Sequence, residues 1–540
     1  LPYGGFYNRA EDFLLSYDFR NRVNYSTVIN EKHSVNLLGG MQVKSADRQN
    51  FSNTGYGYQY DNGGLPAPDY RILKQTIESN FPYYEMGKDY DRFVAFYATG
   101  NYTFNSKYNF TATGRYDGSN RLGKSSTARW LPTWSVAASW NVDRESFMRD
   151  VDWLDNLLFR ASYGLTASMG PANNSNVVLR SINANRPYLS ERESVIQLAS
   201  LENSELTWEK SYTANIGIDA TLLDRRLNVS IDVYQRKSFD LISIIKTSGI
   251  GGEAYKAANY ADMNSWGSEL LLGGEIVRGR NWGWKSSLTV GYNENQITNA
   301  KNIPDIFSLV VAEGGNKEGY PVRSLFSINY KGLDHNTGIP QFVDENGKTA
   351  AAVYLQDQKT EHLVYEGPVD PPLNGGFSNT FHYKAFSANI FITYQAGNKI
   401  RLYPAFKTYY SDLDAMPREF NDRWVLPGDE LLTNVPSIVE AFEAAQLNAA
   451  YPYNNYNYST QRVAKGDFIR LKTVSLSYQL SANTIQRIGF NSVSFTATAA
   501  NLWLIYADKK LKGQDPEFFN SGGVAQPIQK QITLSVKLGI

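Results

Sequence analysis

The residues that most often carry catalysis or hold metals are few and scattered in this chain. The 540 residues contain no cysteine, which excludes disulfides, thiolate metal sites and cysteine nucleophiles. No G-x-S-x-G nucleophile elbow and no P-loop occurs. The four histidines lack the H-E-x-x-H or H-x-H spacing of a metal-ligand pair and stand at His33, His335, His362 and His382. The sequence therefore predicts no catalytic residue, no metal site and no cofactor.

Carboxylates leave two alternatives open. A glycosidase needs only one pair of Asp or Glu side chains at the right separation, and the loops contain many of both. The segment Asp344-Glu345-Asn346-Gly347 is similar to the start of a calcium-binding loop, but the later Glu of an EF-hand is missing. A hairpin turn is the favoured interpretation of this segment, and we do not expect an enzyme.

Tyrosine is the most abundant residue type with binding potential. The chain has 37 Tyr, and several lie in segments rich in Asn, Gly and Pro, such as 56–60 and 451–458. Aromatic side chains in such loops can stack on sugar rings or hydrogen-bond to peptide, or they can pack loops together beside a membrane interface. Packing is favoured for most of them. For a minority we predict substrate binding, by Tyr58, Tyr60, Tyr451, Tyr453, Tyr456 and Tyr458.

The elements that must position these residues are β-strands, because apolar and polar residues alternate with a period of two. The last residues show this without a fault, with one apolar face made by Ile532, Leu534, Val536, Leu538 and Ile540. Similar segments of about ten residues, the height of a membrane-spanning β-strand, recur at 34–43, 93–104, 107–116, 133–140, 213–222, 226–234, 284–293 and 386–395.

Charged residues lie almost wholly on the face opposite to the apolar one. A Lys or Arg on a lipid-facing surface at mid-bilayer would cost roughly 2–4 kcal/mol, so this exclusion is typical of a membrane barrel. We predict that the polar face lines a hydrated lumen and includes Arg115, Asn228 and Asp232.

Short and long connections alternate along the chain, as they do in outer-membrane barrels. The short ones are 105–107, 224–226, 278–281 and 383–385, and the long ones are roughly 45–91, 167–210, 238–263, 295–320, 345–373 and 396–466. We count about 16 strands, with a periplasmic C-terminus. Residues 321–373 are ambiguous, and one further upward strand is required but not placed. Residues 436–449 are expected to form a short amphipathic helix.

Composition agrees with this fold class and excludes others. The net charge is zero, which gives no electrostatic case for nucleic acid. Hydrophobic residues make up 42% of the chain and the mean hydropathy is −0.41, values that a wide barrel shares with soluble proteins. The sequence has no run of 18 apolar residues, so no transmembrane helix is expected.

Several segments, in order, resemble the C-terminal part of the SusC/RagA family of TonB-dependent outer-membrane transporters of Bacteroidota. The resemblance covers residues from about 90 to 540. It is carried by GRYDGSNRLG at 114–123, LPTWSVAASWNVDRESFM at 131–148, FRASYGLTAS at 159–168, LTWEKSYTANIGIDATLLDRRLNVSIDVYQRKSFDLI at 206–242, GLDHNTGIPQFVDENGK at 332–348, NGGFSNTFHYKAFSANIFITYQAGN at 374–398, GDFIRLKTVSLSYQL at 466–480 and NLWLIYADKKLKGQDPEF at 501–518.

The resemblance implies an all-β fold, a transmembrane antiparallel barrel of 22 strands of which this chain supplies about 16. It also implies a plug domain and a TonB-contacting segment, neither of which is visible in residues 1–540, so we expect the chain to be the C-terminal portion of a longer protein. The implied partners are a SusD-like surface lipoprotein, TonB through the absent N-terminal region, outer-membrane lipid, and an oligosaccharide or peptide ligand. Family members usually end in Phe, whereas this chain ends in Ile540.

Three functions follow as hypotheses. The first is active import of oligosaccharides, or of peptides, through a barrel capped by the lipoprotein. The second is a barrel scaffold in a larger outer-membrane complex without transport. The third is a soluble secreted β-protein, in which the apolar faces would meet in a core. Charge exclusion and the rhythm of the connections argue against the third.

Overall fold

The computed structural model describes most of the chain. The described residues are 5–66, 71, 74–75, 84–123, 125–170, 177–185, 192–249, 255–411, 413–446, 448, 450–481, 485, 490–517 and 529–539. The C-terminal Ile540 of the predicted last strand therefore lies outside them. Statements below on what the structure contains refer to these residues.

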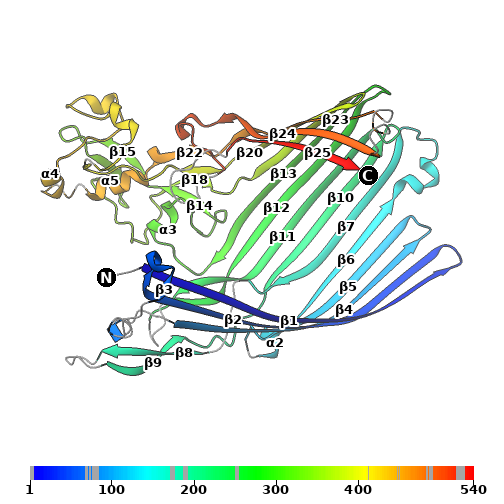
Figure 1. The fold of residues 1–540 in the computed structure, drawn as a ribbon, viewed down its shortest axis with the longest axis horizontal. Helices are drawn as coiled ribbons and strands as arrows, with labels where there is room; N and C mark the ends of the chain where they lie inside the picture. Colours follow the sequence, from blue (N-terminus) through cyan, green and yellow to red (C-terminus); the bar gives the residue numbers. More distant parts are fainter. Residues whose placement is uncertain are drawn as a thin grey trace. The chain divides into compact units, whose positions relative to one another are not determined.

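One large antiparallel sheet of 16 strands dominates the fold, with neighbours following one another in chain order (Figure 1). It consists of β1 (Gly5–Ile29), β2 (His33–Gln59), β3 (Leu65–Pro66), β4 (Tyr84–Phe104), β5 (Tyr108–Ser119), β6 (Trp130–Asn141), β7 (Leu154–Ser168), β10 (Glu209–Leu222), β11 (Leu227–Lys246), β12 (Tyr255–Arg278), β13 (Trp282–Ala300), β19 (Leu373–Tyr383), β20 (Phe386–Ala396), β23 (Phe468–Gln479), β24 (Ser492–Ala507) and β25 (Gln531–Gly539). The all-β class is confirmed. The predicted count of about 16 strands compares with 15 strands along the sheet in the described residues, plus the two-residue β3 that pairs with β2.

The chain divides into two compact units. Unit 1 comprises Leu1–Ala138, Ser162–Thr213 and Ser238–Ala261. Its strands β1 and β2 pair without interruption from Phe6–Tyr56 to the tight turn at 30–32. A separate hairpin pairs β8 (Val178–Asn185) with β9 (Arg192–Ser200). A small apolar core in this unit is made by Leu122, Leu206, Trp208 and Ile242.

Unit 2 comprises Ser139–Ala161, Ala214–Lys237 and Asp262–Ile540. Two of its connections, residues 301–372 and 397–467, fold together beyond the ends of the strands, and we call them the long-loop assembly (Figure 1). It contains α3 (Ile306–Val310), β14 (Ser324–Ser327), β15 (Tyr330–Leu333), β16 (Pro340–Val343), β17 (Thr349–Ala350), β18 (Val364–Pro368), β21 (Lys399–Arg401), α4 (Ala441–Gln446), α5 (Ala450–Asn457) and β22 (Val463–Lys465).

The long-loop assembly has its own hydrophobic core. Residues from both connections meet in it, namely Ile306, Leu309, Val310, Phe326, Ile328, Phe342, Val353, Leu355, Leu363, Phe406, Phe420 and Tyr456. Its helices are short, and nowhere in the described residues is a helix both long and apolar enough to cross a bilayer. The helix expected at 436–449 is confined to α4, while α5 was not expected.

The tight connections predicted from the sequence join consecutive strands as expected. Asn105 and Ser106 have positive φ between β4 and β5, and so do Asp224 and Arg225 between β10 and β11. The segment after Asp344 is the hairpin turn between β16 and β17: the Asp344 carboxylate accepts backbone N–H bonds from Asn346 and Lys348 at 2.9 and 2.7 Å.

Two of the predicted long connections are shorter than expected, because the strands beside them continue beyond the roughly ten residues needed to cross a membrane. Pairing between β2 and β4 extends to Asn53 and Tyr84, which corrects the connection predicted at 45–91. The connection predicted at 238–263 is likewise reduced to the eight residues between β11 and β12. Ladder hydrogen bonds need no apolar side chain, so alternation underestimates such strands. The ambiguous stretch 321–373 adds no strand to the large sheet before β19. In that sheet β24, which the sequence analysis did not place, lies between β23 and β25.

The sheet has one exposed apolar face and one polar face. In β11, Ile231 and Val233 are exposed, while Asp232 between them is an ion-pair partner on the other side. In β25, Ile532, Leu534, Val536 and Leu538 are all exposed. An apolar surface that is this continuous and left open to the surroundings is typical of lipid contact.

We expect Ile216→Lys in the full-length protein to lower the free energy of unfolding from a bilayer by about 2–4 kcal/mol, because Ile216 is 65% exposed on the apolar face of β10. The matched control is Asn215→Lys, which puts the same charge on the opposite face. Urea unfolding in liposomes would measure both. Equal destabilisation by the two variants would contradict the assignment of the faces.

Candidate functional site

Polar side chains on the polar face of the sheet in unit 2 form an ion-pair cluster. Arg160 on β7 contacts Asp219 on β10 through Nε–Oδ2 at 2.6 Å and Nη2–Oδ1 at 3.2 Å, and its Nη2 also lies 2.9 Å from Asp232 Oδ2 on β11. The Ser230 hydroxyl donates to Asp219 at 2.6 Å. A Cβ atom at Gly217 would lie 2.6 Å from Asp232 and 2.8 Å from Arg160, so this glycine leaves the room that the cluster needs.

The predicted lumen residues all lie on this polar side of their strands. Asp232 belongs to the ion-pair cluster, and Asn228 accepts a hydrogen bond from the Thr221 hydroxyl at 3.1 Å. In unit 1, Arg115 Nε is 2.6 Å from Asp117 Oδ1. Sequence reasoning did not single out Arg160 or Asp219, since their strands are recognised by alternation but their partners are set by strand register. That this face lines a lumen stays a prediction.

Arg401 on β21 joins four segments of the long-loop assembly. Arg401 is 1% exposed. Its guanidinium donates to the carbonyl oxygens of Val310, Phe326 and Ser459 at 3.0, 2.6 and 2.8 Å, and to the Ser327 hydroxyl at 3.1 Å. Burial lowers the pKa of the guanidinium to about 9, because the charged form is separated from water. The charge is therefore spread over oriented carbonyl dipoles, and this arrangement fixes the loops.

Two of the six tyrosines predicted to bind substrate are buried, so we withdraw them as ligand contacts. Tyr453 is 1% exposed and donates its hydroxyl proton to the Ser437 carbonyl oxygen, and Tyr456 packs against Phe406 with ring centroids 5.0 Å apart. Burial raises the pKa of each phenol to about 12. Both side chains face inward from α5, where they pack the assembly.

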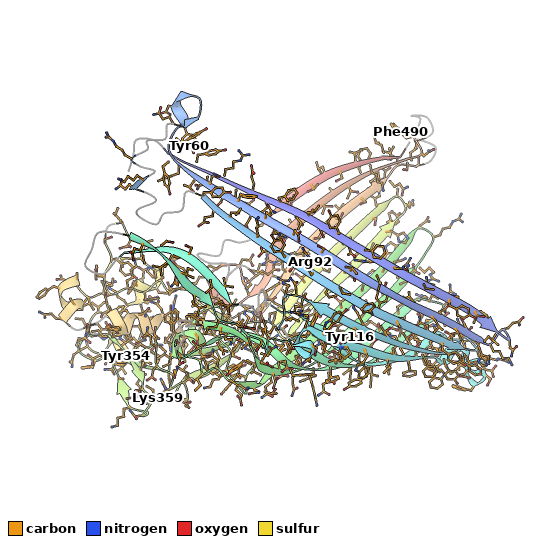
Figure 2. All side chains as sticks on the ribbon, turned by 90° about the horizontal axis from the view of Figure 1, so that it is seen from below. Tyr60, Arg92, Tyr116, Tyr354, Lys359 and Phe490 are labelled. Atoms are coloured by element: carbon orange, nitrogen blue, oxygen red, sulfur yellow. The ribbon has the colours of Figure 1, made fainter. Side chains whose placement is uncertain are left out.

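The other four tyrosines remain accessible. The ring of Tyr451, at the start of α5, is exposed and lies 6.4 Å from the ring of Tyr354. Tyr354 is also exposed (Figure 2), and the sequence analysis did not single it out. Tyr458 is half-buried against Phe307. In unit 1, Tyr58 and Tyr60 have ring centroids 4.6 Å apart. Their contact with a ligand stays a prediction.

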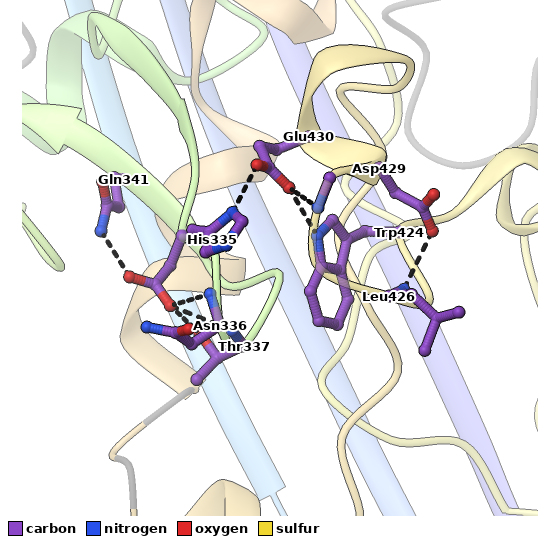
Figure 3. Close-up of polar contacts among 10 residues, drawn as sticks. His335, Asn336, Thr337, Gln341, Trp424, Leu426, Asp429 and Glu430 are labelled. Atoms are coloured by element: carbon purple, nitrogen blue, oxygen red, sulfur yellow. Dashed lines mark hydrogen bonds and ion pairs between the residues drawn. The ribbon is translucent and has the colours of Figure 1, made fainter.

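A second polar arrangement holds the segment 425–432, which we call the apolar loop (Figure 3). Glu430 is its anchor: Oε1 lies 2.6 Å from His335 Nδ1, and Oε2 accepts bonds from Trp424 Nε1 at 3.2 Å and from the Gly428 backbone N–H at 2.8 Å. These contacts lower the pKa of Glu430 to about 2, the bond to His335 being the largest cause. The anchored loop presents exposed Val425, Leu426, Leu431 and Leu432.

Two segments that carry the family resemblance meet in a buried ion pair. Arg470 on β23 lies 2.5 Å from Asp515 and 2.7 Å from Glu517, and the Arg470 and Asp515 side chains are 3% and 1% exposed. The pair ties the connection before β25 to the sheet. Its position supports a structural role for the Asp-Pro-Glu segment. No cluster of three or more His, Asp or Glu suited to a metal occurs among the described residues.

Comparison with protein families identifies the fold. The model described as "TonB dependent receptor-like, beta-barrel" matches residues 2–502. The chain belongs to this family. The two-faced antiparallel sheet is therefore part of a TonB-dependent receptor barrel, a class of outer-membrane protein, and the resemblance found in the sequence is confirmed.

Curated relatives of this receptor barrel come from Formosa and Bacteroides species. TonB-dependent receptor P39 of Formosa agariphila is 26% identical over 564 residues, covering 95% of this chain and 51% of that protein. TonB-dependent receptor SusC of Bacteroides thetaiotaomicron is 25% identical over 519 residues, covering 92% and 47%. The chain thus spans about half the length of the curated relatives it matches.

A solved structure titled as the RagAB peptide transporter has a similar fold. Its TM-score is 0.80 at 22% identity, with 99% of this chain and 56% of that chain covered. At this identity the likeness concerns the fold of the receptor barrel and not its substrate.

We expect Arg401→Met to destabilise the long-loop assembly by about 3 kcal/mol, because three buried carbonyl oxygens would lose their donor. Limited proteolysis of the full-length protein would show faster cleavage in both connections, 301–372 and 397–467. The control is Arg418→Met, which removes an exposed arginine of the same assembly. Unchanged protection in Arg401→Met would contradict the role of this residue.

The Glu430 contacts predict a pH dependence. A carboxyl whose pKa is depressed in the folded state stabilises it above the unfolded value of about 4.3, and this stabilisation is lost as pH falls toward the folded value of about 2. Hydrogen exchange in 423–435, corrected for intrinsic rates, should therefore lose protection between pH 5 and 2.

Glu430→Gln should remove that pH dependence and leave the segment less protected throughout. Asp414→Asn is the control, since the Lys407 and Ser411 contacts also lower the pKa of Asp414 to about 2, but Asp414 lies outside 423–435. Retained acid loosening of 423–435 in Glu430→Gln would show that another group is responsible.

Proposed function

We propose that this chain forms wall and loops of a TonB-dependent outer-membrane importer that takes up oligosaccharides or peptides together with a SusD-like surface lipoprotein. The observation that carries the proposal is the two-faced sheet, with one side that is predominantly apolar and one ion-paired polar side, in a chain that belongs to the receptor-barrel family. The short turns would face the periplasm and the long-loop assembly the outside.

The polar face supports a hydrated path. In the Arg160 cluster a single cation is shared by two carboxylates, and its side chains are 20–36% exposed, so they remain accessible to water and solutes. A sugar or peptide crossing such a face can exchange hydrogen bonds with water for bonds to the wall. Energy for release of the substrate would come from TonB acting on a region outside residues 1–540.

The accessible tyrosines support a polar ligand with flat apolar surfaces. Tyr354 and Tyr451 present two exposed rings on the long-loop assembly, and aromatic faces of this kind stack on sugar rings or pack against peptide side chains. Glycan is favoured over peptide. Substrate contacts by Tyr58, Tyr60, Tyr451 and Tyr458 are part of this proposal.

The apolar loop is the proposed contact for the lipoprotein lid. Leu431 and Leu432 are 85% and 87% exposed, although Glu430 and Asp429 hold the loop in one conformation. Exposed leucines on a fixed loop lose little conformational entropy when they bind, which favours association. A hydrophobic surface of this kind is typical of a protein interface.

We expect the full-length protein, purified from its native outer membrane, to retain a lipoprotein partner. Leu431→Asp/Leu432→Asp should reduce the retained amount by roughly tenfold or more. The reason is that losing about 1.4 kcal/mol of binding free energy from apolar burial already lowers the affinity tenfold. The control is Leu413→Asp, which is 99% exposed in the same connection but outside the apolar loop. Quantitative mass spectrometry of the purified complex gives the ratio.

The same strains should be assayed for uptake of labelled oligosaccharides and peptides, with and without TonB energisation. TonB-dependent uptake that falls in parallel with the retained lipoprotein supports the importer. A stable complex without uptake of either substrate class would instead favour the non-transporting scaffold.

A further inference from the structure

The apolar face of unit 2 contains a hollow with a defined floor and rim. It is a cavity of about 500 Å³ that lies across β13, β19, β20, β23, β24 and β25, which run side by side (Figure 1). None of its lining residues is Asp, Glu, Lys or Arg. The volume falls within the roughly 300–1,000 Å³ usual for small-molecule sites.

The floor is produced by two small residues in one row across the sheet. Ala388 pairs with Leu476, Leu476 with Ala497, and Ala497 with Leu534. On the other side Ala388 pairs with Phe381. Large and small side chains thus alternate across neighbouring strands, and the two alanines leave a depression between larger neighbours.

The rim is an unbroken row of larger side chains, two residues nearer to the short turns. Strand register aligns the rim residues one after another, as Trp282, Tyr383, Phe386, Tyr478, Phe495 and Val536. The Phe386 and Tyr478 rings lie 4.6 Å apart. Aromatic residues in such a position mark the level at which hydrocarbon gives way to lipid headgroups.

Cationic side chains lie at the same end. Lys384 follows Tyr383 in the tight turn, with its Nζ 5.4 Å from the Tyr383 ring centroid. Its backbone N–H donates at 2.8 Å to the carbonyl oxygen of Asn281, so the turn containing Arg280 is adjacent. Lys384 and Arg280 are both exposed. Positive charge just beyond an aromatic rim complements a lipid phosphate.

We propose that this hollow is a binding site for one anionic glycerophospholipid, with an acyl chain on the Ala388/Ala497 floor and its phosphate at Lys384 and Arg280. The inference rests on the membrane placement in the proposed function, but it does not require import. The occupant is a lipid because the floor is uncharged and open to the apolar face. It is anionic because Lys384 and Arg280, the charged residues of the two described turns beside Trp282 and Tyr383, are both cations.

The test uses the full-length protein in nanodiscs that contain phosphatidylglycerol with a photoreactive acyl chain. Crosslinks should concentrate in peptides from β20 and β24. Filling the floor with Ala388→Leu/Ala497→Leu should reduce them by roughly tenfold. The matched control is Ala214→Leu/Ala220→Leu, which fills the same face on β10 and should leave the crosslinks unchanged. Ala388→Leu alone replaces the double variant if heat-modifiability on gels shows that the latter does not fold.

Lys384→Gln/Arg280→Gln should lower crosslinking by phosphatidylglycerol more than crosslinking by phosphatidylcholine with the same acyl chain, because the choline group cancels the net charge of the phosphate. Crosslinks spread evenly around the protein and insensitive to floor filling would show ordinary surrounding lipid and overturn the site. A floor-sensitive signal that is equal for both lipids, and equally changed by the Lys384 and Arg280 substitutions, would overturn the selectivity for an anionic lipid. Lipoprotein retention and uptake are measured on the same samples. If the protein retains the lipoprotein and transports substrate but shows no floor-sensitive crosslinks, only the lipid site is contradicted and the proposed function stands.

Discussion

The structure depends first on the pairing of backbone N–H and C=O groups between antiparallel strands. In hydrocarbon an unpaired peptide group costs several kcal/mol, so a chain that crosses a bilayer as strands must place each beside a neighbour. Pairing fixes the spacing of the strands, and the two-residue period then sends alternate side chains to opposite faces. From this follow the exposed apolar side of β25 and the ion pairs of Arg160 on the other side.

Outside the strands a different interaction takes over. The two connections of the long-loop assembly contain little regular structure, and they are joined by a hydrophobic core and by the buried guanidinium of Arg401. A planar group with five donors is suited to this, because it can bind carbonyl oxygens from separate segments at once. The fixed assembly in turn holds two exposed groups in place, the apolar loop and the Tyr354–Tyr451 pair, for which we propose binding roles.

The local sequence pattern was sufficient to predict the strands of the sheet, but it was insufficient to predict which loop side chains are exposed or buried. Alternation in residues such as Ile532 to Leu538 predicts a strand because both faces are uniform along its length. Asn105-Ser106 predicts a turn because Asn tolerates positive φ and both side chains can hydrogen-bond to the local backbone. Tyr451 and Tyr453 have similar neighbours in sequence, yet one is exposed and the other buried. Their difference is set by Ser437 and the packing of α5. The role of Arg401 could not be predicted from the sequence either, since its hydrogen-bond acceptors are backbone oxygens distant in sequence.

The most direct test of the account is an electron cryo-microscopy structure of the full-length protein in lipid nanodiscs, taken from its native outer membrane. The account predicts a closed barrel in which β1 and β25 pair with further strands, with lipid density along Ile216, Ile231 and the β25 leucines, and water along Arg160 and Asp232. Protein density packed against the apolar face, or water along it, would contradict the assignment of the two faces and with it the proposed importer.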